Sequence, residues 1–325
     1  MPDPMPWQAA WQRALYGPKG FYRQPGGPIG HFSTATHAAA GALLAEGLWR
    51  WADRLAVDGI VDVGAGRGEL LHHLHAAAPD RPLLGLDVVG RPPGLPDAVG
   101  WTVSPGGADL PPGALPRRHL VVANEWLDVV PCVVGQPAPD GALREVLVDP
   151  GTGAETLGGP LSDANLRWCQ TFWPSLFDYH LDTPTRVEVG RARDHAWLAL
   201  LDRAGGGPAI AVDYGHTAAD RPPAGTLTAY RSGREVDLVP DGSCDLTAHV
   251  AVDSLRQTGR LRQRDALDDV PAPDHGLARR DPAEYLARIA RRSEAAMLRR
   301  PGGFGDFWWV VYDPGAQTGA TSSRS

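Results

Sequence analysis

Two groups of residues in this sequence have the types and the spacing that chemistry requires. The first is the run Asp62-x-Gly64-x-Gly66-x-Gly68, which follows a short apolar stretch, and Asp87 comes 25 residues after Asp62. Glycine leaves room for the backbone to approach a ligand closely, and an acid roughly 20 residues after such a turn accepts ribose hydroxyls in nucleotide-binding βαβ units. The pattern therefore predicts that the chain binds a nucleoside.

The second group is a pair of acids, Glu125 and Asp128, in the segment of residues 121–131. If Asn124 caps a short helix, the two carboxylates are three residues apart and share one helix face. Two carboxylates at the end of a strand could hold a cationic group or take a proton from a reacting nitrogen. The alternative is a capped turn with solvated acids, and these residues on their own do not decide between the two.

The elements that would position both groups follow an α/β pattern. Helical spacing predicts helices at residues 7–15, 36–55 and 69–78, and short apolar runs predict strands at residues 60–63, 82–86, 119–123 and 209–212. Strands that alternate with helices form a mostly parallel, doubly wound sheet. We therefore expect an α/β, Rossmann-like fold, with its ligand at the carboxyl ends of the strands.

The details of the glycine turn favour one kind of nucleoside. A dinucleotide fold would have a third glycine where Glu69 stands, which disfavours an NAD-dependent oxidoreductase, and the turn has no Walker lysine. The pattern D-x-G-x-G-x-G instead resembles the first motif of class I methyltransferases, which bind S-adenosyl-L-methionine. On this resemblance Asp62 attracts the cationic methionine part and Asp87 binds the ribose. The residues expected to bind the cofactor are Asp62, Gly64, Gly66, Gly68, Asp87, Asn124 and, for the adenine, Asp109.

Four further segments, taken in order, resemble one family. They are residues 26–39 (GGPIGHFSTATHAA), 123–131 (ANEWLDVVP), 211–216 (AVDYGH) and 225–250, which contains DLTAHV. Together with the glycine turn they resemble the MidA-type methyltransferases, bacterial relatives of the mitochondrial methyltransferase that assists assembly of respiratory complex I. The resemblance implies a class I methyltransferase fold with an N-terminal helical segment and a helical insertion.

The resemblance also bears on the methyl acceptor. The mitochondrial member is a protein arginine methyltransferase, and arginine is carried over here only as a candidate acceptor. The family has an Asp before the Phe of its G-x-F-x-T segment, whereas this chain has His31 before Phe32, where an acceptor would bind. The residues expected on the acceptor side are His31, Phe32, Asp213, Tyr214 and His216.

The expected catalytic roles depend on the acceptor. Because the free pKa of arginine exceeds ~12, carboxylates must hold the guanidinium and favour the nitrogen that loses its proton, and Glu125 and Asp128 are the candidates. For a hydroxyl acceptor, a histidine base from among His31, His216 and His249 is more natural.

Other chemically suggestive residues have simpler interpretations. Asp245 most simply caps a helix, and Trp168 and Trp173 more often belong to a core than to an acceptor cage. The predicted helix after the glycine turn carries three histidines, His72, His73 and His75. No set of acids or cysteines completes a metal site with them, so no metal site is expected.

The sequence therefore predicts an S-adenosylmethionine-dependent methyltransferase that transfers the methyl group in line to an acceptor held by carboxylates. A small-molecule (natural-product) methyltransferase and a cofactor-binding assembly factor without catalysis remain alternatives. The expected organisation is an N-terminal helical segment (1–56), the first half of the methyltransferase core (57–134), an insertion or lid (135–185), the second half of the core (186–314) and a disordered tail (315–325).

Composition excludes several other classes. The net charge of −7 and the pI of about 5.9 give no basic face for nucleic acid. The three cysteines are widely spaced, so we expect neither a disulfide framework nor a zinc site. No apolar run of about 18 residues and no signal peptide is visible, so we expect a cytoplasmic protein without membrane insertion. The partner is then a protein or small-molecule acceptor, and the oligomeric state stays open.

Overall fold

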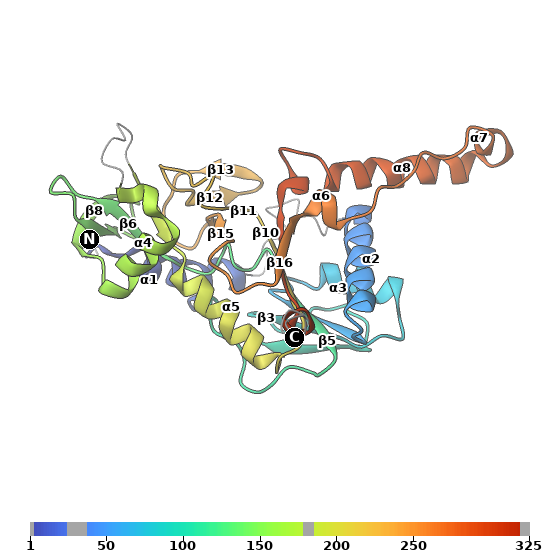
Figure 1. The fold of residues 1–325 in the computed structure, drawn as a ribbon, viewed down its shortest axis with the longest axis horizontal. Helices are drawn as coiled ribbons and strands as arrows, with labels where there is room; N and C mark the ends of the chain where they lie inside the picture. Colours follow the sequence, from blue (N-terminus) through green and yellow to red (C-terminus); the bar gives the residue numbers. More distant parts are fainter. Residues whose placement is uncertain (1–2, 25–37, 178–184, 319–325) are drawn as a thin grey trace, which may run out of the picture.

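The computed structural model describes residues 3–24, 38–177 and 185–318. Within these residues, a seven-stranded sheet forms the centre of the molecule (Figure 1). Neighbouring strands pair in parallel, except that β17 is antiparallel to both of its neighbours. Across the sheet the order is β16 (Gly259–Arg262), β17 (Trp308–Tyr312), β10 (Ala209–Asp213), β5 (His119–Asn124), β2 (Gly59–Val63), β3 (Leu83–Asp87) and β4 (Val99–Val103).

Helices cover both faces of this sheet, because its central strands are apolar on both sides. Ile60 of β2 packs in a core with residues of α2 (Ala38–Arg54) and α3 (Glu69–Ala77). The next residue, Val61, packs on the opposite face with Trp197 of α5 (Arg191–Arg203). A strand that is buried on both faces has a nearly continuous apolar sequence. A parallel sheet with helices on both faces is the doubly wound α/β arrangement that the sequence predicts.

A second sheet lies beside the first and uses the insertion. Within the described residues its order is β1 (Met5–Pro6), β7 (Leu143–Val148), β6 (Val133–Pro137) and β9 (Val187–Val189), and β8 (Glu155–Pro160) pairs with β7. The insertion contains the expected aromatic helix, α4 (Asp163–Phe172), followed by the 3-10 helix η3 (Pro174–Phe177). The sequence did not predict β6, β7 and β8, which pair with one another, while β7 also pairs with β1 and β6 with β9 from other parts of the chain.

The N-terminal helix joins this second sheet to the rest of the molecule. Trp7 and Trp11 of α1 (Trp7–Tyr16) are fully buried against β6, β7 and β14 (Asp245–Thr247). After α1, the 3-10 helix η1 (Phe21–Arg23) leads to residues 25–37, outside the described part. The remaining short strands are β11 (Gly215–His216), β15 (Val250–Ala251), β12 (Thr228–Arg231) and β13 (Arg234–Val236).

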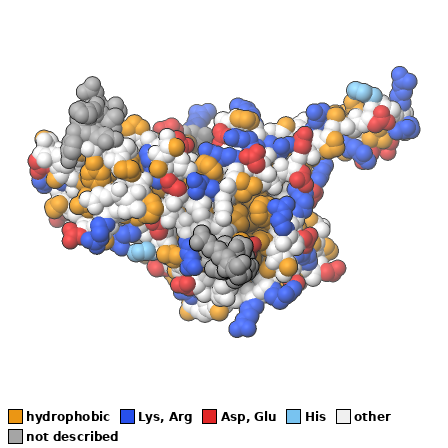
Figure 2. Space-filling model, viewed as in Figure 1, with side chains coloured by type: hydrophobic (Ala, Val, Ile, Leu, Met, Phe, Trp, Pro, Cys, Tyr) orange, Lys and Arg blue, Asp and Glu red, His pale blue; other side chains and the backbone are white. Residues whose placement is uncertain are grey.

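The C-terminal part carries a helical arm. After α6 (Gln263–Ala266), α7 (Leu277–Arg280) and α8 (Pro282–Leu298) project away from the body (Figure 1), and arginine side chains are spread along this arm (Figure 2). The chain then returns through the 3-10 helix η4 (Phe304–Asp306) and β17 to α9 (Pro314–Thr318), which occupies the first part of the predicted disordered tail. None of the helices in the described part is both long and apolar enough to cross a bilayer.

Candidate active site

The site lies where the strand order of the central sheet reverses. The chain runs from β2 through β3 to β4 in one direction, and β5 then pairs with the other edge of β2. Open α/β sheets bind ligands at such a switch point, outside the carboxyl ends of the strands. Here the ends of β2 and β5 border a cavity of about 620 Å³, within the size range of small-molecule sites.

The glycine turn forms one wall of this cavity. Gly64, Gly66 and Gly68 have φ angles of +74°, +58° and +82°, which a residue with a side chain adopts only at a cost. The turn is fixed by Gly64, whose N–H donates to the Leu86 carbonyl oxygen at 2.9 Å. Gly64 and Gly66 line the cavity, and Gly68 lies just before α3.

Two carboxyl groups, those of Asp62 and Asp87, lie beside the turn. One carboxylate oxygen of Asp87 accepts the N–H of Gly66 at 2.8 Å, and the other accepts the N–H of Val89 at 3.2 Å. Burial raises the pKa of Asp87 to about 6, against the effect of these hydrogen bonds. Burial, and then the charges of Asp87 and Glu69, raise the pKa of Asp62 to about 8. Both acids line the cavity, where a cationic ligand would stabilise their ionised forms.

Asp109, expected near an adenine, lies elsewhere. It is exposed and absent from the cavity wall, and its carbonyl oxygen accepts the hydroxyl of Ser104 at 2.8 Å. Ser104, Gly106 and Gly107 line the cavity instead.

Glu125 lies at the end of β5 in a strained conformation. Its φ is +49°, and its N–H donates to the Val212 carbonyl oxygen at 2.8 Å, which fixes it against the end of β10. The expected short helix capped by Asn124 is absent, because the chain turns here instead, and the Asn124 side-chain amide donates to Glu125 Oε1 at 3.3 Å. Non-glycine residues with positive φ are concentrated at functional sites, and Glu125 and Asn124 both line the cavity.

Asp128 lies deeper and is held by neighbours from distant segments. Its Oδ2 accepts the hydroxyls of Tyr214 and, at 2.7 Å, of Thr247. Its N–H donates to Asp213 at 3.1 Å. Burial raises the pKa of Asp128, and the hydrogen bonds from Tyr214 and Thr247 oppose that shift. Asp128 and Tyr214 line the cavity, whereas Asp213 lies behind its wall, where burial and the charge of Asp128 raise its pKa well above the usual value.

The structure adds two residues to the cavity that the sequence did not predict there, Asp245 and Thr247. Asp245 does not cap a helix but lies in β14, where it faces the cavity and accepts the Tyr22 hydroxyl at 2.6 Å. Burial raises the pKa of Asp245 to about 8. Thr247 also lines the cavity, as does His249, which the sequence offers as a candidate base for a hydroxyl acceptor. The DLTAHV segment was the available signal, but its spacing alone does not show which side chains point inward.

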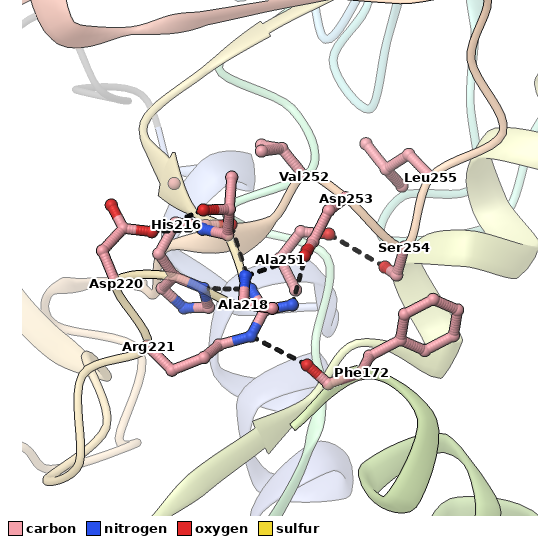
Figure 3. Close-up of polar contacts among 12 residues, drawn as sticks. Phe172, His216, Ala218, Asp220, Arg221, Ala251, Val252, Asp253, Ser254 and Leu255 are labelled. Carbon is pink, nitrogen blue, oxygen red and sulfur yellow. Dashed lines mark hydrogen bonds and ion pairs between the residues drawn. The ribbon is translucent and has the colours of Figure 1, made fainter. Parts of the chain in front are cut away.

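His216 does not line the cavity and belongs to a separate polar cluster (Figure 3). Its Nδ1 accepts an N–H of Arg221 at 2.6 Å, and Arg221 also donates to Asp253 and to the Phe172 carbonyl oxygen. Burial, and then the charge of Arg221, lower the pKa of His216 to about 3. Arg221 thus connects His216 with the end of α4, and the neutral imidazole is not placed to act as a base in the cavity.

Of the remaining candidates, two fall outside the described part of the chain and the others do not line the cavity. His31 and Phe32 lie outside the described residues. Trp168 and Trp173 are buried in the core of the insertion, as expected. His72, His73 and His75 lie on α3, and the described residues contain no group of acids, histidines and cysteines that could hold a metal ion.

The lining of the cavity is strongly acidic and suits cationic ligands. Its charged side chains in the described part are one arginine, Arg67, and six acids, which are Asp62, Glu69, Asp87, Glu125, Asp128 and Asp245. A doubly wound sheet with a glycine turn after β2 and an acid at the end of β3, both at the switch point, is the arrangement of the class I methyltransferases.

Comparison with known proteins agrees with this class. The family described as "Putative S-adenosyl-L-methionine-dependent methyltransferase" matches residues 89–268, more than half of the chain. The chain belongs to this family, and its cofactor is S-adenosyl-L-methionine. This agrees with the resemblance to MidA-type methyltransferases. No protein of curated function matches the sequence.

Two crystal structures of proteins from Burkholderia thailandensis share the fold. One is an uncharacterized protein, with a TM-score of 0.70 and 22% identity over 95% of this chain and 87% of the other. The second is described as a "likely methyl transferase" bound to S-adenosyl-homocysteine, with a TM-score of 0.67 and 20% identity over 95% and 88% of the two chains. At these identities the similarity establishes the fold alone.

The residues of the cavity fit the chemistry of this cofactor. The exposed backbone at Gly64 and Gly66 allows close approach, and a Cβ on Gly66 would lie 3.1 Å from a carboxylate oxygen of Glu69. Asp62 and Asp87 offer carboxylates to an ammonium and a diol. The family match begins after both, so their assignment depends on this geometry.

Proposed function

We propose that this methyltransferase acts on a cationic nitrogen and that its acceptor is the side chain of an arginine in a protein. The observation that carries the proposal is the acid content of the cavity beyond the glycine turn. Glu125, Asp128 and Asp245 all line that end, and no Lys or Arg of the described residues lines it. A positively charged acceptor would offset the repulsion among these carboxyl groups.

Unused hydrogen-bond acceptors support a donor-rich substrate. Among the described residues, the Oδ1 atoms of Asn124 and Asp128 are buried and accept no hydrogen bond. A buried acceptor without a partner is costly, and a guanidinium carries five N–H donors in a planar fork. An arginine side chain could therefore pair with groups that the protein itself leaves unpaired.

The two acids at the end of β5 would have different roles. When bound, the cofactor supplies an electrophilic methyl group. Asp128 Oδ2 is already occupied by Tyr214 and Thr247, so Asp128 would hold and orient the acceptor through Oδ1. Glu125, held rigidly at the strand end, would bind the reacting nitrogen and accept the proton that it loses. Alignment of the nucleophile supplies most of the catalysis in this scheme.

The test uses methyl-labelled S-adenosyl-L-methionine, the purified protein and an extract from which small molecules can be separated. Arginine-containing peptides and free arginine serve as defined acceptors. The protein is compared with Glu125→Gln, which keeps the shape of the side chain but removes its charge. Glu145→Gln is the matched control, because Glu145 lies in β7 and away from the cavity.

We expect label in protein and in the peptide, located on arginine, for the wild type and Glu145→Gln but not for Glu125→Gln. Calorimetry should show that all three proteins bind S-adenosyl-homocysteine equally well. Label found only in small molecules would contradict the protein acceptor and favour a tailoring enzyme. Binding of the product without any transfer would favour a binding protein that assists assembly.

A further inference from the structure

Arg193, a residue of α5, lies immediately behind the acceptor wall. It is 1% exposed and does not line the cavity. All three nitrogens of its guanidinium donate to main-chain carbonyl oxygens: Nη2 to Asp128 at 2.6 Å, Nε to Val130 at 3.2 Å and Nη1 to His249 at 2.8 Å. A rigid planar fork is therefore spread across two separate segments of backbone.

These two segments carry the acceptor side of the cavity. Asp128 follows β5, whereas Thr247 and His249 come about 120 residues later in the chain and reach the same wall. The main chains also meet directly, since the N–H of Ala248 donates to the Asp128 carbonyl oxygen at 3.2 Å. That same carbonyl oxygen accepts Arg193, so one guanidinium fixes the point where both segments join.

The charge of Arg193 acts on the same wall. None of its hydrogen bonds goes to a carboxylate, yet it lowers the pKa of Asp128 and of Asp213, against the effect of burial. A buried cation costs free energy, and here nearby carboxylates on other elements compensate for it. The titratable groups that feel its charge are Tyr16, Asp128, Cys132, Asp194, Asp213, His216 and His249.

We propose that Arg193 is a positioning residue for methyl transfer, which sets the register of the Asp128 and His249 segments and so the shape of the acceptor site. The proposal rests on the proposed function for the identity of the acceptor, but not for the fixing of the two segments. In this role Arg193 itself contacts neither the cofactor nor the substrate. Because a misplacement of about 1 Å can cost about 100-fold in rate, loss of this fork should affect transfer more than cofactor binding.

The test compares Arg193→Lys, which keeps the charge but loses the fork, with Arg193→Gln, which loses both. Arg203→Lys is the matched control, because Arg203 lies at the other end of α5 and bonds to the Pro111 and Gly113 carbonyl oxygens away from the cavity. The readouts are kcat and KM against pH on the arginine peptide, binding of S-adenosyl-homocysteine, and hydrogen exchange of amides at residues 126–131 and 246–250.

For Arg193→Lys we expect faster exchange in both segments, a loss of about 10-fold or more in kcat/KM and cofactor binding within about twofold of the wild type. The acid limb of the profile of kcat/KM against pH should stay in place, because Arg193→Lys keeps the positive charge near Asp128. In Arg193→Gln, if it folds, that limb should move to higher pH, because Asp128 then binds its proton more tightly. A residue important only for stability would lower the melting temperature without moving the pH profile.

Unchanged kcat/KM and unchanged exchange in Arg193→Lys would overturn the proposal. If the wild type transfers no methyl group to cationic acceptors, the proposed function fails, and exchange alone then decides the role of Arg193. Faster hydrogen exchange in only one of the two segments would also contradict the proposal, because Arg193 would then not hold both segments.

Discussion

Gly66 donates its N–H to the carboxylate of Asp87 across 2.8 Å, which ties the glycine turn after β2 to the end of β3. The contact places the backbone of the turn and the carboxyl group of Asp87 side by side at the wall of the cavity. Gly66 follows β2, and Asp87 is the last residue of β3. The two residues meet because the carboxyl ends of these neighbouring parallel strands lie at one edge of the sheet.

Substitution of Gly66 by Val should weaken cofactor binding. Gly66 has a φ of +58°, which costs a residue with a side chain roughly 1–2 kcal/mol, and the new side chain would also occupy the cavity. We expect the Kd of S-adenosyl-homocysteine to rise by about 10-fold or more, measured by calorimetry. Gly205→Val is the control, since Gly205 has a φ of +59° but no atoms close to its Cβ position and lies away from the cavity. Equal Kd values for the two variants would contradict this role of Gly66.

Binding of S-adenosyl-L-methionine should release protons near pH 7. The pKa of Asp62 is about 8 in the free protein, so its carboxyl group is mostly protonated at pH 7. A cationic ligand lowers this pKa, and up to about one proton is then lost on binding. Calorimetry at pH 7 in two buffers with different ionisation enthalpies measures this number. Asp62→Asn should abolish the proton release, whereas the control Asp97→Asn, at an exposed site, should not. If the binding enthalpy of the wild type is the same in both buffers, no proton is released and the prediction is wrong.

Replacement of Asp245 by Asn should selectively weaken binding of a cationic acceptor. The amide keeps the size of the side chain and can still accept from Tyr22, but it cannot ionise when a cation binds, whereas the carboxyl group of Asp245 can. We expect KM for the arginine peptide to rise about 10-fold while the Kd of the cofactor stays the same. Asp241→Asn provides the comparison in the neighbouring loop, where Asp241 is exposed and accepts the Ser243 N–H. An unchanged KM in Asp245→Asn would remove Asp245 from the acceptor site.

Arg221 should be important for stability rather than for chemistry. Its side chain is 2% exposed, and Arg221→Met would remove its hydrogen bonds to Asp253, His216 and the Phe172 carbonyl oxygen (Figure 3). Breaking a buried pair of this kind costs about 3–5 kcal/mol, which denaturant unfolding would measure. Arg118→Met removes an ion pair with Asp58 that is exposed on both sides, and we expect no measurable change. Similar stabilities for the two variants would show that the cluster is not important.

The sequence by itself determined the features that depend on neighbours along the chain. The mostly apolar runs at residues 60–63 and 209–212 became buried parallel strands, because a strand covered on both faces needs apolar side chains on both sides. The turn between β2 and α3 required glycine, and its three glycines all have positive φ. The spacing of Asp62 and Asp87 was sufficient to place both at one rim of the cavity, since one βα unit separates them.

Only the tertiary structure decided which distant residues complete the site. Tyr22 meets Asp245 across 223 positions of the sequence, and Arg193 reaches the Asp128 segment from α5. The strand β7 pairs with β1 near the N-terminus, and β6 pairs with β9 more than 50 residues later. The chain after Asn124 turns and does not form the expected helix. Local spacing cannot specify such contacts, because their free energy comes from burial and hydrogen bonding that exist only once separate segments have packed together.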